Sequence, residues 1–234
     1  MIKRWRHIGE IGGDPWVLPI WPSIHKVIPG NKIQKSQKRL SNLALYISTK
    51  LDMMPWIIKR INKQCKELWD IIEKRDKEDD YWNEHQGRDL LLDDELKYNL
   101  IIDLESLIFE LESCLELMRQ FLLQIYEISN SKIRRKQINN EFKNIILQDD
   151  INATWYDDLE KHRNFFIHQG APYIAIDLTN EGEYYDLIIM KENLKKFDNR
   201  KKFLLLSDLH RIVYGFIKAR GALQQHIIKH LGNI

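Results

Sequence analysis

The sequence predicts an all-α fold: an antiparallel helical bundle with a long central helix and a small β-hairpin insertion. Two observations predict it. Along most of the chain, apolar residues recur at alternating steps of three and four, which is the spacing of a helix with one buried face. Between residues 171 and 190 the pattern changes to short β-branched and aromatic runs that are typical of strands. With 234 residues, 44% of them hydrophobic and 30% charged, the chain fits one compact domain with at most a modest appendage.

The first 34 residues are expected to form an extended arm, and residues 35–234 the helical domain. The arm contains four of the six prolines and four of the ten glycines, and both residue types disfavour regular helix. Three tryptophans, Trp5, Trp16 and Trp21, could pin this arm to the surface of the bundle.

The first bundle helix is expected from about residue 35. Pro55 suits the first turn of a helix, so we expect a break or a new start near Met54. The apolar stripe of this region keeps the spacing of three and four residues. It consists of Leu51, Met54, Ile58, Ile61, Cys65, Leu68 and Ile72.

The clearest element follows an acidic stretch at 76–95. Its apolar residues keep a 4-3-4-3 rhythm for four heptads, which indicates a long bundle helix. A second stripe runs beside the first and widens the apolar face, so this helix should be central and contact two neighbours. The first stripe is Leu100, Leu104, Leu107, Leu111, Cys114, Met118, Phe121, Ile125 and Ile128, and the second is Ile101, Ile108, Leu115 and Leu122.

Three elements are expected in the last third of the chain. A helix spans about 152–169, with Gly170 and Pro172 as its stop. Residues 171–178 and 184–190 then form the β-hairpin of about 171–190. The final helix begins near Ser207 as N-cap. Its apolar stripe is Leu209, Ile212, Val213, Phe216, Leu223, Ile227 and Leu231.

Composition narrows the class of protein. No apolar stretch reaches the length that a membrane helix needs, and Gly, Asp, Glu and Pro interrupt any signal-peptide core, so we expect a cytoplasmic protein. Two cysteines, Cys65 and Cys114, lie at apolar helix positions and are expected to be reduced core residues. No phosphate-binding glycine loop, nucleophile elbow or metal-binding motif is present, and we expect neither a cofactor nor a metal.

One segment concentrates polar groups on a single helix face. On the helix that ends with RNFFIH, residues 163–168, Asn164 and His168 lie within about 40° of each other, and Lys161 shares their side. The opposite face carries Trp155, Leu159, His162 and Phe166, which should enter the core. Arg163 lies about 140° from His168 around the helix, so either Arg163 bends its long side chain round the helix or a second copy of the chain completes the site.

This set of side chains suits cleavage of an RNA backbone without metal. The imidazole of His168 can take a proton from a 2′-hydroxyl or give one to the leaving 5′-oxygen. Arg163 is always charged and can hold two phosphate oxygens as charge develops in the transition state. Asn164 could orient the histidine ring or bind the phosphate.

The RNFFIH segment at the end of an amphipathic helix resembles the Arg-(x)4–6-His motif of the HEPN superfamily, in which the residue after Arg is commonly polar. The resemblance implies a metal-independent endoribonuclease that works as a homodimer with a composite site, often as a toxin or in phage defence. It also implies that Arg163 and His168 are catalytic and that Asn164 supports them. Some members carry a tyrosine two residues after the histidine; here that position is Gly170.

The hypothesis also names RNA-binding residues and partners. Lys161 would lie beside the scissile phosphate, and a basic stretch would steer RNA. The dimer would form through the helix that carries 157–168, and the family resemblance suggests an antitoxin or regulatory protein as a further partner. The basic residues of the stretch are Lys132, Arg134, Arg135 and Lys136.

Several alternatives stay open. Arg220 and His226 form a second match to the spacing, but Gly221 follows the arginine, whereas Asn164 follows Arg163. Arg163 could instead pair with Asp158 or Glu160 on the helix surface, and His168 could interact with the helix dipole. His226 and His230, four residues apart, could hold an ion. The alternative function is a non-catalytic helical module that binds RNA, a nucleotide or a partner protein.

Overall fold

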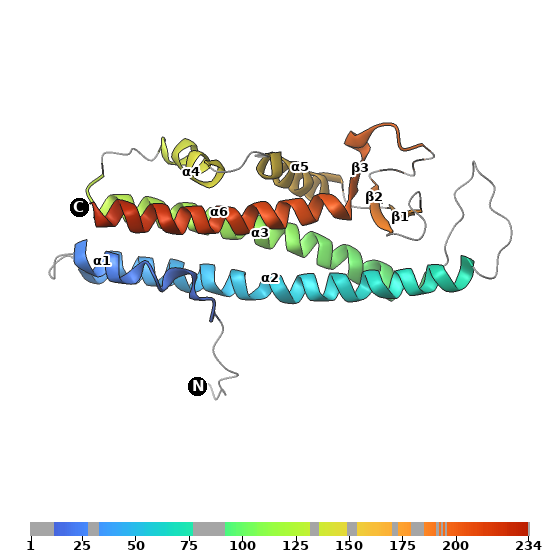
Figure 1. Cartoon of the computed structure of the whole chain (residues 1–234), viewed down its shortest axis with the longest axis horizontal. Helices are drawn as coiled ribbons and strands as arrows, with labels where there is room; N and C mark the ends of the chain where they lie inside the picture. Colours follow the sequence, from blue (N-terminus) through green and yellow to red (C-terminus); the bar gives the residue numbers. More distant parts are fainter. Residues whose placement is uncertain are drawn as a thin grey trace, which may run out of the picture.

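A computed structural model describes residues 12–27, 33–76, 92–131, 136–148, 154–169, 173–178, 185–190, 192, 194 and 196–233. The chain is mostly helical and carries a small antiparallel sheet. Its helices form an elongated bundle with the sheet at one end (Figure 1). Among the described helices, none is both long and apolar enough for a membrane span.

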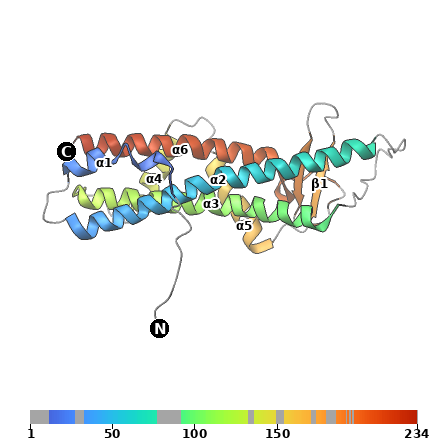
Figure 2. The ribbon, with the colours of Figure 1, turned by 90° about the horizontal axis from the view of Figure 1, so that it is seen from below.

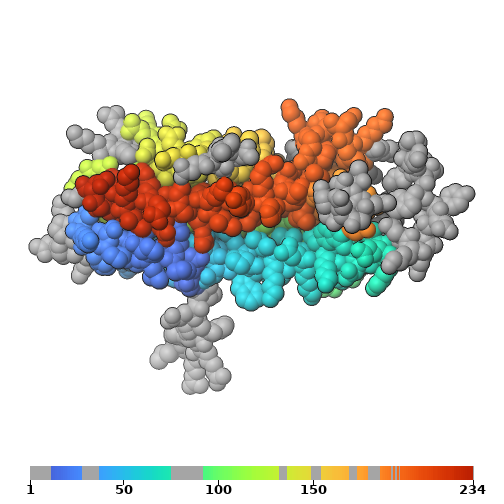
Figure 3. All heavy atoms as spheres, in the orientation of Figure 1, coloured from blue at the N-terminus to red at the C-terminus, as the bar shows by residue number. Residues whose placement is uncertain are grey.

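The bundle has three layers. Helices α1 (Trp21–Val27) and α2 (Ile33–Asp76) form one side, and α3 (Asp94–Ile128) and α6 (Leu206–Gly232) lie in the middle (Figures 1 and 2). The third layer consists of α4 (Ile138–Leu147) and α5 (Thr154–Gln169), which follow one another along the bundle and cover α3 and α6. The same stacking of α2, α6 and the α4–α5 layer is visible on the surface in Figure 3.

The prediction of a long central helix is confirmed by α3. This helix packs against α2, α4, α5 and α6. Its N-cap is Asp93, whose side chain accepts a hydrogen bond from the Glu95 backbone N–H at 3.1 Å. Of the two expected stripes, all residues are buried except Ile101 and Ile128, which are partly buried.

Helix α2 runs through Pro55 without interruption, so the expected break near Met54 is wrong. A proline inside a helix removes one backbone hydrogen bond and crowds the preceding turn. Here the turns on both sides are buried, with Met54 before the proline and Ile57 and Ile61 after it. Burial of apolar side chains on both sides offsets the local cost of the proline. The buried stripe passes through Ile57, whereas Ile58, which the sequence placed in the stripe, is only partly buried.

The helices are not all antiparallel. Ion pairs Lys50–Glu110 at 2.6 Å and Arg60–Asp103 at 2.6 Å show that α2 and α3 run in opposite directions. By contrast, α6 runs parallel to α3, because Tyr126 contacts His226 and Ser129 contacts His230. The prediction of an antiparallel bundle is therefore corrected for α3 and α6, because α4, α5 and the sheet return the chain to the start of α3 before α6 begins.

The hairpin strands are confirmed and a third strand joins them. β1 (Tyr173–Asp177) pairs antiparallel with β2 (Asp186–Met190), which pairs antiparallel with β3 (Phe203–Leu205). The turn between β1 and β2 lies outside the described residues. β3 is three residues long, too short for an alternating pattern to announce it.

Helix α6 begins one residue before the expected N-cap. Ser207 lies inside the helix, where its hydroxyl donates to Asp186 on β2 at 2.7 Å. The first turn is capped instead by Asp208, whose carboxylate accepts from the Leu205 backbone N–H at 3.1 Å. The sheet is thus tied to the helix start, and its strand β2 packs on α6.

The N-terminal segment is partly helical, which corrects the prediction of an extended arm. It contains a 3₁₀ turn, Pro15–Val17, and the short helix α1. Pro15 stands in the first turn of its helix, where its missing N–H costs nothing. Trp16 is buried and donates its indole N–H to the Arg220 carbonyl at 2.7 Å, which fixes the segment to α6. Trp5 lies outside the described residues.

The two cysteines are free and buried, as the sequence predicted. Cys65 is on α2 and Cys114 on α3. Burial raises the pKa of each thiol to about 12, because a thiolate loses hydration inside the protein. Both act as small apolar core residues.

A candidate site beside the Arg-His motif

Helix α5 is anchored by the apolar face that the sequence predicted. Trp155, Leu159, His162 and Phe166 are all buried. The indole of Trp155 lies directly over Gly215 of α6, where an added Cβ would be 2.3 Å from the ring. This close approach requires glycine at position 215 and fixes how closely α5 packs on α6.

His162 is a core residue and not a second base. It is 6% exposed, and neither ring nitrogen has a hydrogen-bond partner among the described residues. Burial lowers its pKa from 6.5 to about 4, although Asp208 and Asp158 act in the opposite direction. The ring is therefore neutral at physiological pH.

Arg163 and His168 diverge within one chain. Arg163 reaches α3, where its Nη1 lies 2.7 Å from Oε1 of Glu112, and its side chain remains 37% exposed. Asn164 and His168 are exposed, and no hydrogen bond or ion pair joins either to the described part of the chain. The ion pair with Asp158 or Glu160 that the sequence left open is replaced by one with Glu112.

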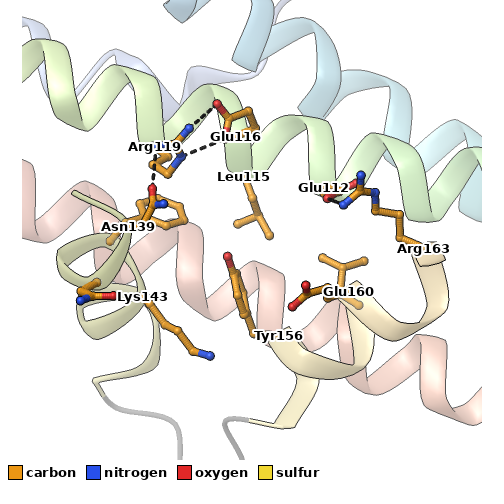
Figure 4. Close-up of a pocket in the computed structure, with 12 residues that line it drawn as sticks. Glu112, Leu115, Glu116, Arg119, Asn139, Lys143, Tyr156, Glu160 and Arg163 are labelled. Carbon is orange, nitrogen blue, oxygen red and sulfur yellow. Dashed lines mark hydrogen bonds and ion pairs between the residues drawn. The ribbon is translucent and has the colours of Figure 1, made fainter. Parts of the chain in front are cut away.

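Arg163 lies in the wall of a pocket of about 340 Å³ between α3, α4 and α5 (Figure 4). The Tyr156 side chain stands in its middle with the hydroxyl directed toward α3, and the Glu160 carboxylate lies beside it. The wall is mainly polar, with four residues from each helix. They are Glu112, Leu115, Glu116 and Arg119 of α3, Asn139, Asn140, Phe142 and Lys143 of α4, and Tyr156, Leu159, Glu160 and Arg163 of α5.

Each cation of this pocket already has an acidic partner. Arg119 donates from Nε and Nη2 to Glu116 at 2.8 and 2.5 Å, and from Nη1 to the Asn139 side-chain oxygen at 2.7 Å. Lys143 lies 3.0 Å from Asp157, and Arg163 pairs with Glu112. Glu160, by contrast, is exposed and has no ion-pair or hydrogen-bond partner among the described residues. The unpaired charge of the pocket is negative.

Two glutamates and the tyrosine of the pocket have shifted pKa values. Burial raises the pKa of Glu112, Arg163 lowers it, and Glu160 and Glu116 raise it again, with a net increase. Burial also raises the pKa of Glu116, but hydrogen bonds from Arg119 and Gln120 bring it below its usual value. Burial raises the pKa of Tyr156, so its hydroxyl stays a hydrogen-bond donor at neutral pH.

Sequence reasoning identified Arg163 but missed the pocket beside it. Tyr156, Glu160 and Arg163 are spaced by four and three residues, which places them on one face of α5 and was a readable signal. Asn139 and Lys143 belong to α4, a ten-residue helix that the sequence did not predict.

The predicted RNA-binding lysines are only partly described. Lys161 is 70% exposed and pairs with Asp158 at 3.0 Å. Lys136 is exposed at the start of the α4 region. The other three residues of the basic stretch, Lys132, Arg134 and Arg135, lie outside the described residues.

The second Arg-His match has structural contacts. Arg220 lies 3.3 Å from Asp14, and His226 Nε2 lies 2.8 Å from the Tyr126 hydroxyl. These contacts join the N-terminal segment and α3 to α6. His230, which the sequence paired with His226 as an ion site, lies 3.0 Å from the Ser129 hydroxyl instead.

Comparison of the chain with family models, curated proteins and solved structures finds no match.

Proposed function

We propose that the protein is a metal-independent endoribonuclease of HEPN type that acts in the cytoplasm as a homodimer, as a toxin or phage-defence effector. One observation supports this most directly. Helix α5 is fixed by its buried face, and its last turns present Asn164 and His168 to solvent beside a half-exposed Arg163. These are the arginine and histidine of the motif and the polar residue that commonly follows the arginine, and all three can reach an RNA backbone from this face.

The proposed reaction is an internal transfer at phosphorus. The 2′-oxygen of RNA attacks the adjacent phosphorus while the bond to the 5′-oxygen breaks. His168 of one chain takes the proton of the 2′-hydroxyl, and protonated His168 of the second chain gives a proton to the 5′-oxygen. The products are a 2′,3′-cyclic phosphate and a 5′-hydroxyl. Arg163 binds the phosphate oxygens in the transition state, and Asn164 supports the phosphate or the imidazole.

The geometry of one chain supports the proposed dimer. Arg163 is held toward α3 by Glu112, whereas His168 lies about 140° away around α5. A two-fold axis across α5 supplies each histidine with an arginine from the other copy. Ile167, 43% exposed between Asn164 and His168, gives this face an apolar contact for the second α5.

RNA approach would use the basic residues near this face. Lys161 is exposed on α5 and can exchange Asp158 for a phosphate oxygen, and Lys136 is exposed before α4. The same face, once occupied by an antitoxin or regulatory protein, would be closed to RNA.

Product analysis tests the proposal. The purified chain, in buffer with EDTA, is incubated with a labelled RNA oligonucleotide and with the same oligonucleotide carrying 2′-deoxyribose throughout. The proposal predicts cleavage of the RNA alone, with cyclic-phosphate and 5′-hydroxyl ends. Cleavage of both, or 5′-phosphate ends, contradicts it, because neither outcome is compatible with attack by the 2′-oxygen.

A second candidate function is a non-catalytic module that binds a nucleotide, RNA or a partner protein. The Arg163–Glu112 ion pair favours it, since that contact turns the guanidinium toward the pocket between α3, α4 and α5. In that case ligand binding without RNA cleavage is expected, and Arg163→Ala weakens binding while His168→Ala does not.

A further inference from the structure

The pocket between α3, α4 and α5 has the chemistry of a site for a hydrogen-bond donor and not for a free anion. Arg119, Lys143 and Arg163 are each paired with a carboxylate. A phosphate inside the pocket would therefore compete with an existing ion pair at Arg119, at Lys143 and at Nη1 of Arg163. Glu160 is the acid without a partner among the described residues, so the fitting ligand donates hydrogen bonds to a carboxylate.

The pocket also offers an aromatic ring and amides. Tyr156 stands in the middle of the pocket with its hydroxyl inside it (Figure 4). The side-chain oxygen of Asn139 accepts from Arg119 at 2.7 Å, which leaves its NH₂ group to donate. A planar heterocycle that has adjacent donors on one edge and acceptors on another matches this set.

We propose that this pocket binds a guanine base of the RNA substrate, next to the phosphate that Arg163 holds. The guanine edge places N1–H and N2–H side by side, and these two donors match the two oxygens of the Glu160 carboxylate. Adenine, cytosine and uracil each place at least one hydrogen-bond acceptor where guanine has these two donors. The Glu160 carboxylate repels such an acceptor. The Tyr156 hydroxyl and the Asn139 amide then donate to guanine O6 and N7.

The position of Arg163 connects this subsite to the chemistry. Glu160 precedes Arg163 by three residues on α5, less than one turn, so a base and its phosphate can contact both at once. The contact of Arg163 with Glu112 is through Nη1, and the other guanidinium nitrogens remain for phosphate oxygens. This inference rests on the proposed ribonuclease function for the identity of the ligand, and on the pocket for its chemistry.

Binding of mononucleotides to the full chain tests the subsite apart from cleavage. Guanosine, adenosine, cytidine and uridine 3′-monophosphates are titrated into the wild-type protein, Glu160→Gln, and the control Glu67→Gln, whose glutamate is exposed on α2 away from the pocket. We expect guanosine 3′-monophosphate to bind at least about tenfold more tightly than the others, because a charged hydrogen-bonding pair discriminates by this order. Glu160→Gln removes that preference and Glu67→Gln keeps it.

The outcomes separate the subsite from the nuclease. Equal binding of the four nucleotides, or a guanine preference that survives Glu160→Gln in a folded protein, overturns the subsite. Cleavage of an RNA containing a single guanosine completes the test. Guanine-selective binding without RNA cleavage supports the subsite and contradicts the proposed function. Cleavage that depends on Arg163 and His168 but does not depend on the position of the guanosine supports the proposed function and contradicts the subsite.

Discussion

Replacing Gly215 by alanine should loosen the helix that carries the motif. The new Cβ would lie 2.3 Å from Cγ and 2.5 Å from Cδ1 and Cδ2 of the Trp155 indole, far inside the contact distance of about 3.5–4.0 Å between carbon atoms. Trp155 is 1% exposed, so the rigid ring cannot swing away without moving α5. Overpacking of this kind costs about 1–3 kcal/mol, and the upper end applies here.

The same helix contains a matched control. Gly221 also lies in α6, and nothing lies within 4 Å of an added Cβ there. Gly221→Ala should raise the free energy of unfolding by about 1 kcal/mol through helix propensity. Gly215→Ala gains the same amount but loses about 3 kcal/mol to the overlap, for a net loss of about 2 kcal/mol.

Thermal unfolding of both variants measures the difference. The expected gap of about 3 kcal/mol corresponds to a midpoint lower by about 6–12 °C in Gly215→Ala than in Gly221→Ala, for a chain of this size. Equal midpoints for the two variants would contradict this expectation, since they would show that the indole does not lie against Gly215.

Three further predictions concern buried polar groups. Burial lowers the pKa of His162 from 6.5 to about 4, so between these pH values the unfolded chain binds more protons than the folded chain. The free energy of unfolding therefore falls as the pH is lowered from 6.5 to 4, by about 3 kcal/mol from this group. Urea unfolding across this range should show a shallower pH dependence for His162→Leu than for wild type, and an equal pH dependence would contradict the buried, neutral state of His162. Asp103→Ala should lower the free energy of unfolding by about 2 kcal/mol, because the buried carboxylate accepts hydrogen bonds from Arg60 at 2.6 Å and from Gln64 at 3.0 Å. If this variant is as stable in urea as wild type, these hydrogen bonds contribute nothing to stability. Tyr126→Phe removes the 2.8 Å contact with His226 and should lower the free energy of unfolding by about 1 kcal/mol, measured by the same urea assay. A variant more stable than wild type would contradict a structural role for this contact.

Long helices with regular spacing could be predicted from the sequence, and short elements could not. In α3 the rhythm extends over four heptads, so single departures do not hide it. α4 has ten residues and β3 has three, too few periods for a pattern to stand out. Pro55 shows a different limit, because its local preference for a helix start is overcome by tertiary packing that the sequence does not display.

In the candidate site, the features set by α5 alone could be predicted from the sequence, and those that need other helices could not. The buried and exposed faces of α5 follow from its own sequence, so Arg163 and the exposure of His168 could be placed in advance. Glu112 could not be named as the partner of Arg163, because it is 51 positions earlier and meets Arg163 only through the packing of α5 on α3. The pocket needs three helices to form, and one of them was not expected.

Cleavage of RNA in EDTA by single-residue variants tests whether Arg163 and His168 form a ribonuclease site. Arg163→Ala and His168→Ala are compared with wild type and with Arg39→Ala and His210→Ala, which replace an exposed arginine and an exposed histidine elsewhere on the bundle. Circular dichroism and sedimentation establish that every variant is folded and has the wild-type oligomeric state. We expect cleavage to fall by at least about a hundredfold in the first two variants and to be unchanged in the controls. Wild-type cleavage by a folded Arg163→Ala or His168→Ala protein, or no cleavage of any RNA by a wild-type dimer, would contradict it.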